Sequence, residues 1–129
     1  MPAPKNYVGT TPISEPESRA IYDFTLKNNF KLVIAYHTQG KEIYWNFQNL
    51  APESAKIIGE KFAKASGYLL TEVPYNSSFA GYKDWFIQKH IKPGYTVEAG
   101  LGENPLSISQ FDEIYNDNMG ILVLGLVNA

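Results

Sequence analysis

The chain of 129 residues contains no cysteine, which excludes disulfide bonds and thiolate metal sites. It has only two histidines, His37 and His90, and a single arginine, Arg19. Acidic and basic residues are spread along the chain to a formal net charge of −2, without the basic block typical of nucleic-acid-binding proteins. The densest apolar run, residues 121–127, is too short to cross a bilayer. These absences favour a protein that binds neither nucleic acid nor membrane.

The N-terminal residues have no apolar stretch behind them and do not resemble a secretory signal, so we expect a soluble, cytoplasmic protein. The length suits one domain over residues 1–129, enough to bury a core. Residues 1–13 are rich in Pro and Thr and are predicted to be an extended segment. The nine Tyr, seven Phe and two Trp are explained by packing, with an aromatic-lined cleft as the alternative.

Helical signals occur in four segments, which are residues 14–27, 52–66, 80–91 and 106 to the C-terminus. The first begins with Ser14 and has Glu17 three positions later, the spacing of a capping box. The end of the last segment is apolar nearly all round, so we expect that part of the helix to be deeply buried.

Apolar strands alternate with these helices. Residues 30–37 are nearly continuously apolar and rich in branched side chains, which predicts a strand covered on both faces. Residues 42–45, 68–73 and 95–99 are predicted to form shorter strands. Helices alternating with apolar strands indicate an α/β fold with helices on both faces of a sheet.

Two strands end in a polar side chain, His37 in one and Glu98 in the other. Ligands of open α/β sheets bind outside the carboxyl ends of the strands, so parallel strands would bring both side chains to one edge. Each residue also has a plainer interpretation, a structural histidine and a solvated carboxylate. His90 follows two polar residues in a short helix and is predicted to face solvent. The residues alone therefore indicate an α/β domain with a candidate site at a sheet edge.

Four motifs then occur in order, which are SEPE at 14–17, AYHTQG at 35–40, AGYKDW at 80–85 and TVEAG at 96–100. Glu98 follows Trp85 by thirteen positions, and Ser109-Gln110 lies near the start of the last helix. In this order they resemble the closing motifs of the zinc metallocarboxypeptidases, over about residues 7–126. The resemblance is nearer to bacterial members that cleave γ-D-glutamyl–diamino acid bonds of cell-wall peptides than to pancreatic enzymes. It implies the C-terminal half of that fold, an open, mixed, mostly parallel sheet.

The resemblance also implies roles for the two strand-end residues. His37 matches the last zinc ligand, and Glu98 matches the glutamate that serves as general base and acid. A catalytic Zn²⁺ keeps three protein ligands and an open position for water, whose pKa it lowers. A carboxylate beside that water takes its proton and returns it to the leaving amine.

The chain departs from the family because the His-x-x-Glu pair that supplies the other zinc ligands lies upstream of the matched region and is not present here. The zinc site is therefore incomplete, and Arg19 does not match the family's substrate-binding arginines. We expect half of an enzyme, inactive and weak in zinc binding by itself, that self-associates through an exposed sheet edge or pairs with a companion chain. The alternative is a non-catalytic remnant or a peptide-binding module.

Four residues are predicted to contact a peptide substrate such as a cell-wall muropeptide. Lys83 matches the base of the family's side-chain pocket, where a cation would favour a carboxylate such as that of diaminopimelate; the alternative is that it points to solvent. The family's mobile tyrosine falls near Asn76, with Tyr75 one position away and Tyr82 further on. Thr38, directly after His37, completes the set.

Overall fold

The computed structural model describes residues 9–79 and 81–129, which form two compact units, residues 9–30 and 31–129. The first unit carries helix α1 (Pro16–Lys27). The expected capping box is wrong, because the helix begins later and Glu15 occupies the cap position without a side-chain bond. The Ser14 hydroxyl donates instead to the Glu15 carboxylate, at 2.8 Å. Most of the expected extended segment, residues 1–8, lies outside the described residues, and the single domain stays a prediction.

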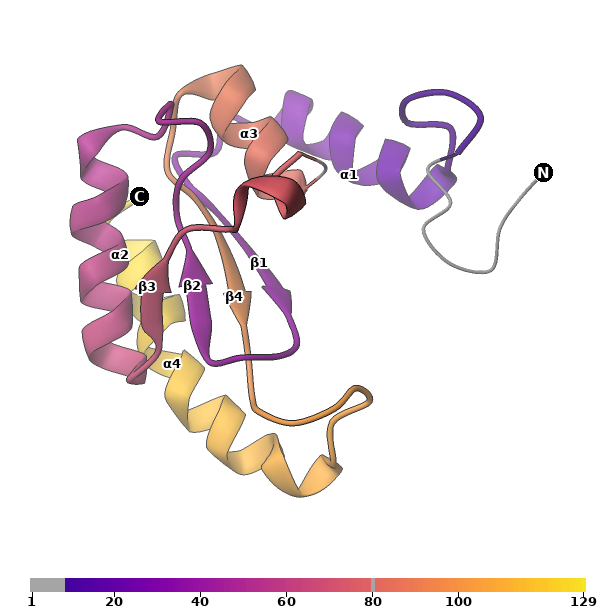
Figure 1. The fold of residues 1–129 in the computed structure, drawn as a ribbon. Helices are drawn as coiled ribbons and strands as arrows, with labels where there is room; N and C mark the ends of the chain where they lie inside the picture. Colours follow the sequence, from indigo (N-terminus) through magenta and orange to yellow (C-terminus); the bar gives the residue numbers. More distant parts are fainter. Residues whose placement is uncertain (1–8, 80) are drawn as a thin grey trace. The chain divides into compact units, whose positions relative to one another are not determined.

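The second unit contains the sheet, with its strands in the order β1-β4-β2-β3 (Figure 1). Its elements in chain order are β1 (Val33–His37), β2 (Glu42–Tyr44), α2 (Glu53–Ser66), β3 (Leu69–Thr71), the 3₁₀ turn η1 (Tyr75–Ser77), α3 (Tyr82–His90), β4 (Gly94–Glu98), the 3₁₀ turn η2 (Ile108–Gln110) and α4 (Phe111–Val127). Strand β4 is parallel to β1 and antiparallel to β2, and β2 is parallel to β3. The prediction of an open, mixed, mostly parallel sheet is confirmed.

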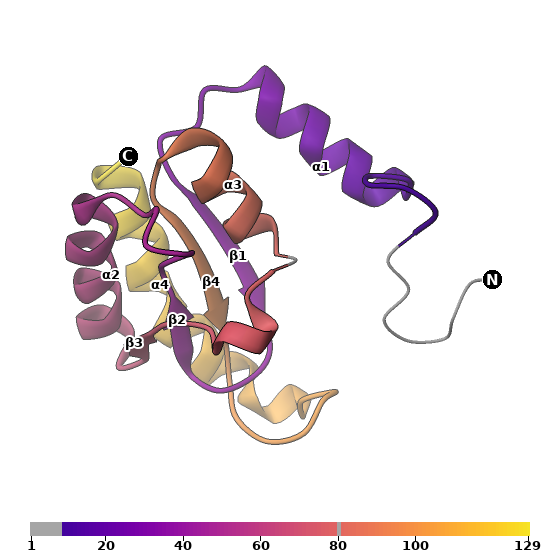
Figure 2. The same ribbon diagram turned by 45° about the horizontal axis from the view of Figure 1, so that its top comes forward.

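Helices cover both faces of this sheet (Figure 2). Alternate residues of β4 point to opposite faces. Tyr95 and Val97 pack with α2 and α4, whereas a Cβ on Gly94 would touch Ile87 and Lys83 of α3. Helices α2 and α4 therefore lie on one face, and α3 lies on the other.

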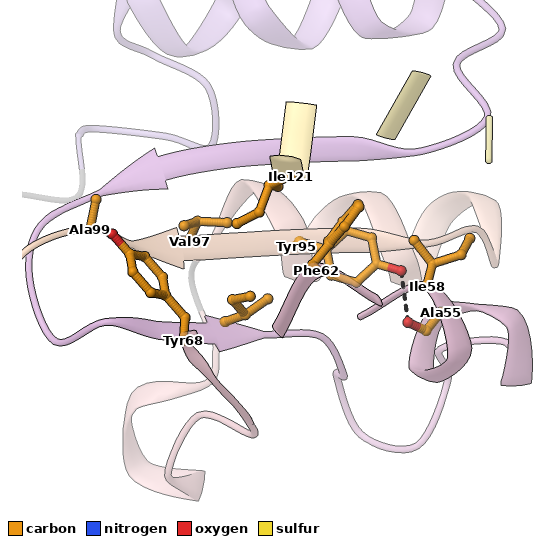
Figure 3. Close-up of a cluster of buried hydrophobic side chains, with 9 residues drawn as sticks. Ala55, Ile58, Phe62, Tyr68, Tyr95, Val97, Ala99 and Ile121 are labelled. Carbon is orange, nitrogen blue, oxygen red and sulfur yellow. Dashed lines mark hydrogen bonds between the residues drawn. The ribbon is translucent and has the colours of Figure 1, made fainter. Parts of the chain in front are cut away.

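The hydrophobic core lies between the sheet and the α2–α4 pair (Figure 3). The rings of Tyr95 and Phe62 meet edge to face, with their centroids 4.9 Å apart. The Tyr95 hydroxyl donates to the Ala55 carbonyl at 2.7 Å. On the same helix, a Cβ on Gly59 would lie 2.7 Å from a methyl group of Leu70. Glycine at this position allows α2 to approach β3 closely.

Helix α4 is buried along one stripe only, so the expected deep burial of its end is wrong. Its buried residues are Asn118, Ile121 and Gly125, while Leu126 is 81% exposed. The stripe packs on α2 and the sheet, whereas Leu122 and Leu126 on the remaining surface of the helix are exposed. None of the helices in the described part of the chain is both long and apolar enough to cross a membrane.

Strand β1 is likewise covered incompletely. It begins at Val33, later than expected, and its burial falls along the strand until Tyr36 and His37 are exposed. The expectation of cover on both faces therefore fails at its carboxyl end. This end of the strand carries the candidate site.

Candidate active site

His37 and Glu98 lie side by side at the carboxyl ends of β1 and β4. The register of the parallel pair places the two residues opposite each other. Facing residues on neighbouring strands point their side chains to the same side of the sheet, and neighbouring strands lie about 5 Å apart. The expected position at one sheet edge is confirmed, whereas the roles of the two residues stay a prediction.

A third residue, Glu42, extends this row on the other side of Glu98. The antiparallel register of β2 and β4 pairs Glu42 with Glu98. The Tyr44 hydroxyl donates to the Glu42 carboxylate at 2.6 Å, which raises the pKa of Tyr44 to about 12. Glu42 could not be predicted as a neighbour, because β2 follows β1 directly in the chain and no local pattern reveals that β4 inserts between them.

The environment of Glu98 favours its protonated form. Partial burial, followed by the nearby Glu42 carboxylate, raises the pKa of Glu98, while His37 acts in the opposite direction. A raised pKa strengthens the conjugate carboxylate as a proton acceptor nearer to neutral pH. The row His37–Glu98–Glu42 therefore provides an imidazole beside a carboxylate suited to moving a proton.

The loop that follows His37 is fixed by Asn104. The Thr38 hydroxyl donates to Asn104 Oδ1 at 2.8 Å, and Asn104 Nδ2 donates to the Thr38 carbonyl at 3.0 Å. Gly40 N–H donates to the Gly100 carbonyl at 2.8 Å. Thr38, predicted to bind substrate, thus has a structural partner for its hydroxyl, and that binding role remains untested.

Lys83 is buried at 2% exposure, so the alternative that it points to solvent is wrong. Its ammonium pairs with the adjacent Asp84 and donates to the Asn46 carbonyl at 2.6 Å. Asp84 also accepts from the Gly81 N–H at the start of α3. The charge predicted to receive a substrate carboxylate is already compensated, and that role stays a prediction.

His90 is half-buried, so its expected solvent exposure is also wrong. The last turn of α3 folds its ring against Phe86 and Trp85, with ring centroids 4.8 and 5.7 Å away. Its Nε2 is buried without a hydrogen-bond partner among the described residues. Burial, followed by the nearby Lys92 and Lys89, lowers the pKa of His90.

Tyr75 and Asn76 lie on the turn η1 and are exposed. Tyr75 lines a hollow of about 500 Å³ together with residues 46–49. Neither His37 nor Glu98 belongs to the lining of this hollow. The predicted contact of Tyr75 and Asn76 with substrate is therefore left untested.

The described residues do not form a complete metal site. Across residues 9–79 and 81–129, no three His, Asp or Glu side chains gather closely enough to hold a metal ion. His37 is a suitable single ligand, but a catalytic zinc requires three. The arrangement fits one part of a zinc site and not the whole of it.

The chain matches a known protein family and curated relatives over nearly its whole length. Residues 1–120 match the family described as zinc carboxypeptidase. Gamma-D-glutamyl-L-diamino acid endopeptidase 1 of Lysinibacillus sphaericus is 48% identical over 125 residues, which are 97% of this chain and 31% of that protein. The chain spans about a third of the length of the curated relatives it matches.

Solved structures support the fold. Carboxypeptidase A from Helicoverpa armigera superposes with a TM-score of 0.77 at 19% identity, over 95% of this chain and 36% of that one. Bovine thrombin-activatable fibrinolysis inhibitor, in complex with tick carboxypeptidase inhibitor, gives the same TM-score at 20% identity, over 95% of this chain and 48% of that one.

Proposed function

The chain belongs to the zinc carboxypeptidase family, and from this membership we propose that it forms the part of a zinc-dependent peptidase that carries the proton-transfer glutamate and one metal ligand. His37 is the proposed ligand, and Glu98 is the proposed general base and acid. The observation that carries the proposal is their register at the ends of two parallel strands. The substrate we propose is a γ-D-glutamyl–diamino acid bond of a cell-wall peptide, because the relative with 48% identity is named for that bond.

Glu98 would take a proton from the attacking water and return it to the leaving amine. Its raised pKa, caused chiefly by burial, keeps the carboxylate basic enough for the first transfer and acidic enough for the second. Zinc, when bound, supplies a positive charge that polarises the scissile carbonyl. Because this chain offers one zinc ligand, the remaining ligands must come from polypeptide other than these residues.

A second candidate function is supported by the incomplete metal site. A chain with one ligand acts as a non-catalytic, peptide-binding module if no partner completes the site. The two functions are separated by measuring hydrolysis of γ-D-glutamyl-diaminopimelate peptides with and without a companion. The companion is the polypeptide formed by the Lysinibacillus endopeptidase residues outside the 125 matched ones, co-expressed with this chain.

We expect the chain alone to lack stoichiometric zinc and activity, and the complex to have both. Glu98→Gln in the complex lowers kcat by about 10²- to 10⁴-fold, the usual contribution of a general acid–base group. Glu60→Gln on the exposed face of α2 is the matched control and leaves kcat unchanged. Stoichiometric zinc in the chain alone, lost in His37→Ala, would refute the need for outside ligands. An inactive complex that still binds the peptide would support the second function.

A further inference from the structure

The carboxylate of Glu42 lies beside the candidate site and has no part in the proposed reaction. Ile43, the next residue of β2, is fully buried in the core between the sheet and the α2–α4 pair. Because side chains alternate along a strand, Glu42 and Tyr44 point to the opposite face. Glu98 follows Val97, which is also fully buried in that core, so its side chain points the same way. Both carboxylates therefore open on one face of the sheet, on the neighbouring strands β2 and β4 (Figure 1).

This juxtaposition of two carboxylates is unfavourable unless a cation relieves it. Like charges directly opposite each other on neighbouring strands destabilise a sheet. Among the described residues, neither Glu42 nor Glu98 forms an ion pair with a lysine or an arginine. The ammonium of Lys41, adjacent in sequence, pairs instead with Glu113 and Asp117 of α4. The face around Glu42 therefore carries a negative charge that these residues leave uncompensated.

Tyr44 holds the Glu42 carboxylate in place. Its hydroxyl donates to Glu42 Oε2 at 2.6 Å, whereas Oε1 accepts no hydrogen bond from a described residue. Across residues 9–79 and 81–129, no three His, Asp or Glu side chains are spaced to hold a metal ion, so Glu42 does not complete a metal site with His37 and Glu98. A fixed carboxylate with an available oxygen suits a charged hydrogen-bond donor such as an ammonium.

We propose that Glu42, held by Tyr44, is a specificity-determining residue that binds the side-chain ammonium of the diamino acid on the amine side of the cleaved bond. This role rests on the proposed function, in which Glu98 acts on the scissile bond. Neighbouring strands lie about 5 Å apart, and the four-carbon stem of a lysine-type side chain spans about that distance. A side chain that runs from the bond at Glu98 across to β2 thus brings its ammonium to Glu42. The relative with 48% identity is named for a bond to an L-diamino acid, and the second amino group of such a residue is this cation.

Lys83, the other charged side chain predicted to recognise substrate, has a different environment. Its ammonium pairs with Asp84, and the two side chains are 2% and 8% exposed. Glu42 is half-buried and lacks an opposite charge among the described residues. Recognition of a cation at Glu42 therefore breaks no existing ion pair, whereas recognition of an anion at Lys83 requires the separation of a buried one.

The test compares two peptides that differ only in the charge. They are γ-D-glutamyl-L-lysine and γ-D-glutamyl-L-norleucine, whose side chain has the same four carbons without the ammonium. The enzyme is the zinc-loaded complex with the Lysinibacillus polypeptide defined above. The measured quantity is the ratio of the two kcat/KM values, because a disturbance of Glu98 affects both peptides alike and cancels. Glu42→Gln should lower this ratio by about 10- to 100-fold, the value of one charge-assisted hydrogen bond.

Two further variants complete the series. Tyr44→Phe removes the hydroxyl that orients Glu42 and should lower the same ratio by about threefold to tenfold. Glu60→Gln removes a carboxylate on the exposed face of α2 and should leave the ratio unchanged. A variant that only disturbs the fold lowers both activities and keeps the wild-type ratio. An unchanged ratio in Glu42→Gln, or a wild-type complex that does not prefer the lysine peptide, would therefore overturn the proposal.

A binding measurement distinguishes the recognition role of Glu42 from the proposed catalysis. If neither peptide is hydrolysed, the proposed function fails, and calorimetry gives the dissociation constants of both peptides in the complex or, where none forms, in the chain alone. A preference for the lysine peptide that Glu42→Gln removes would then leave Glu42 as the cation-binding residue of a peptide-binding module. Equal affinities, or binding of neither peptide, would refute the recognition role as well.

Discussion

The buried ion pair between Lys83 and Asp84 gives a prediction whose size follows from the structure. The two side chains are 2% and 8% exposed, and the ammonium has one further partner, the Asn46 carbonyl. Asp84→Asn removes the opposing charge and leaves the ammonium in a site closed to water. Removing one member of a buried pair costs about 3–5 kcal/mol, because the remaining charge is uncompensated.

The double variant Lys83→Met/Asp84→Asn removes both charges and keeps similar volumes. Replacing a whole buried pair by uncharged residues is often close to neutral. We therefore expect each single variant to lose about 3–5 kcal/mol and the double variant to lose less than either. Urea unfolding of the four proteins at one pH gives the coupling energy directly.

Additive effects, or an Asp84→Asn cost below about 1 kcal/mol, would show that water reaches the ammonium. Lys83 would then be free to receive a substrate carboxylate, as its position in the family pocket predicts. A strong coupling energy between Lys83 and Asp84 would instead show that Lys83 has a structural role, which is to hold α3 against residue 46. The same cycle thus separates a structural role from a recognition role.

Three further predictions concern stability. The pKa of His90 is lowered mainly by burial, so the contribution of this residue to the free energy of unfolding is present above the ordinary histidine pKa and is lost as pH falls through the lowered pKa. The urea midpoint should therefore drop between about pH 7.5 and about pH 5, and it should drop less steeply in His90→Phe. Parallel pH profiles of the two proteins would contradict this. Gly59→Ala should cost about 1–3 kcal/mol in urea unfolding, because the 2.7 Å approach to Leu70 outweighs the helical gain of about 1 kcal/mol, and a more stable variant would refute the close contact. Asn104→Ala should lower the free energy of unfolding by about 1 kcal/mol and speed amide exchange at residues 38–40, whereas unchanged exchange there would show that Asn104 does not fix the loop.

The sequence predicted the parts of the fold that depend on local pattern. Alternating helices and apolar strands indicated an α/β sheet, and the strand ends pointed to His37 and Glu98. Their position at one edge of the sheet followed from one rule, that parallel strands end at the same edge, whereas their direct adjacency came only from the strand register. Glu42 was missed because strand order is a non-local property, and the antiparallel β2 has no local mark of its direction.

Apart from the capping box at Ser14, the wrong predictions concerned burial rather than the type of element. An apolar residue indicates that its side chain becomes buried, but it does not indicate which part of the protein buries it. The end of α4 is apolar nearly all round, yet only one stripe of it is buried among the described residues. The prediction for His90 was wrong in the opposite direction. Its neighbours in sequence are polar and suggested exposure, but α3 places two aromatic rings against it.

The strand order has a consequence for how the chain is made. Strand β4 is synthesised after β1, β2 and β3, yet it lies between β1 and β2. When the described residues have emerged only as far as β3, β4 is absent and neither β2 nor β3 pairs with β1. The row containing His37 and Glu98 comes into existence only when the last strand inserts. Before that moment the emerging residues include the unpaired apolar strand β1, and unpaired apolar strands favour aggregation.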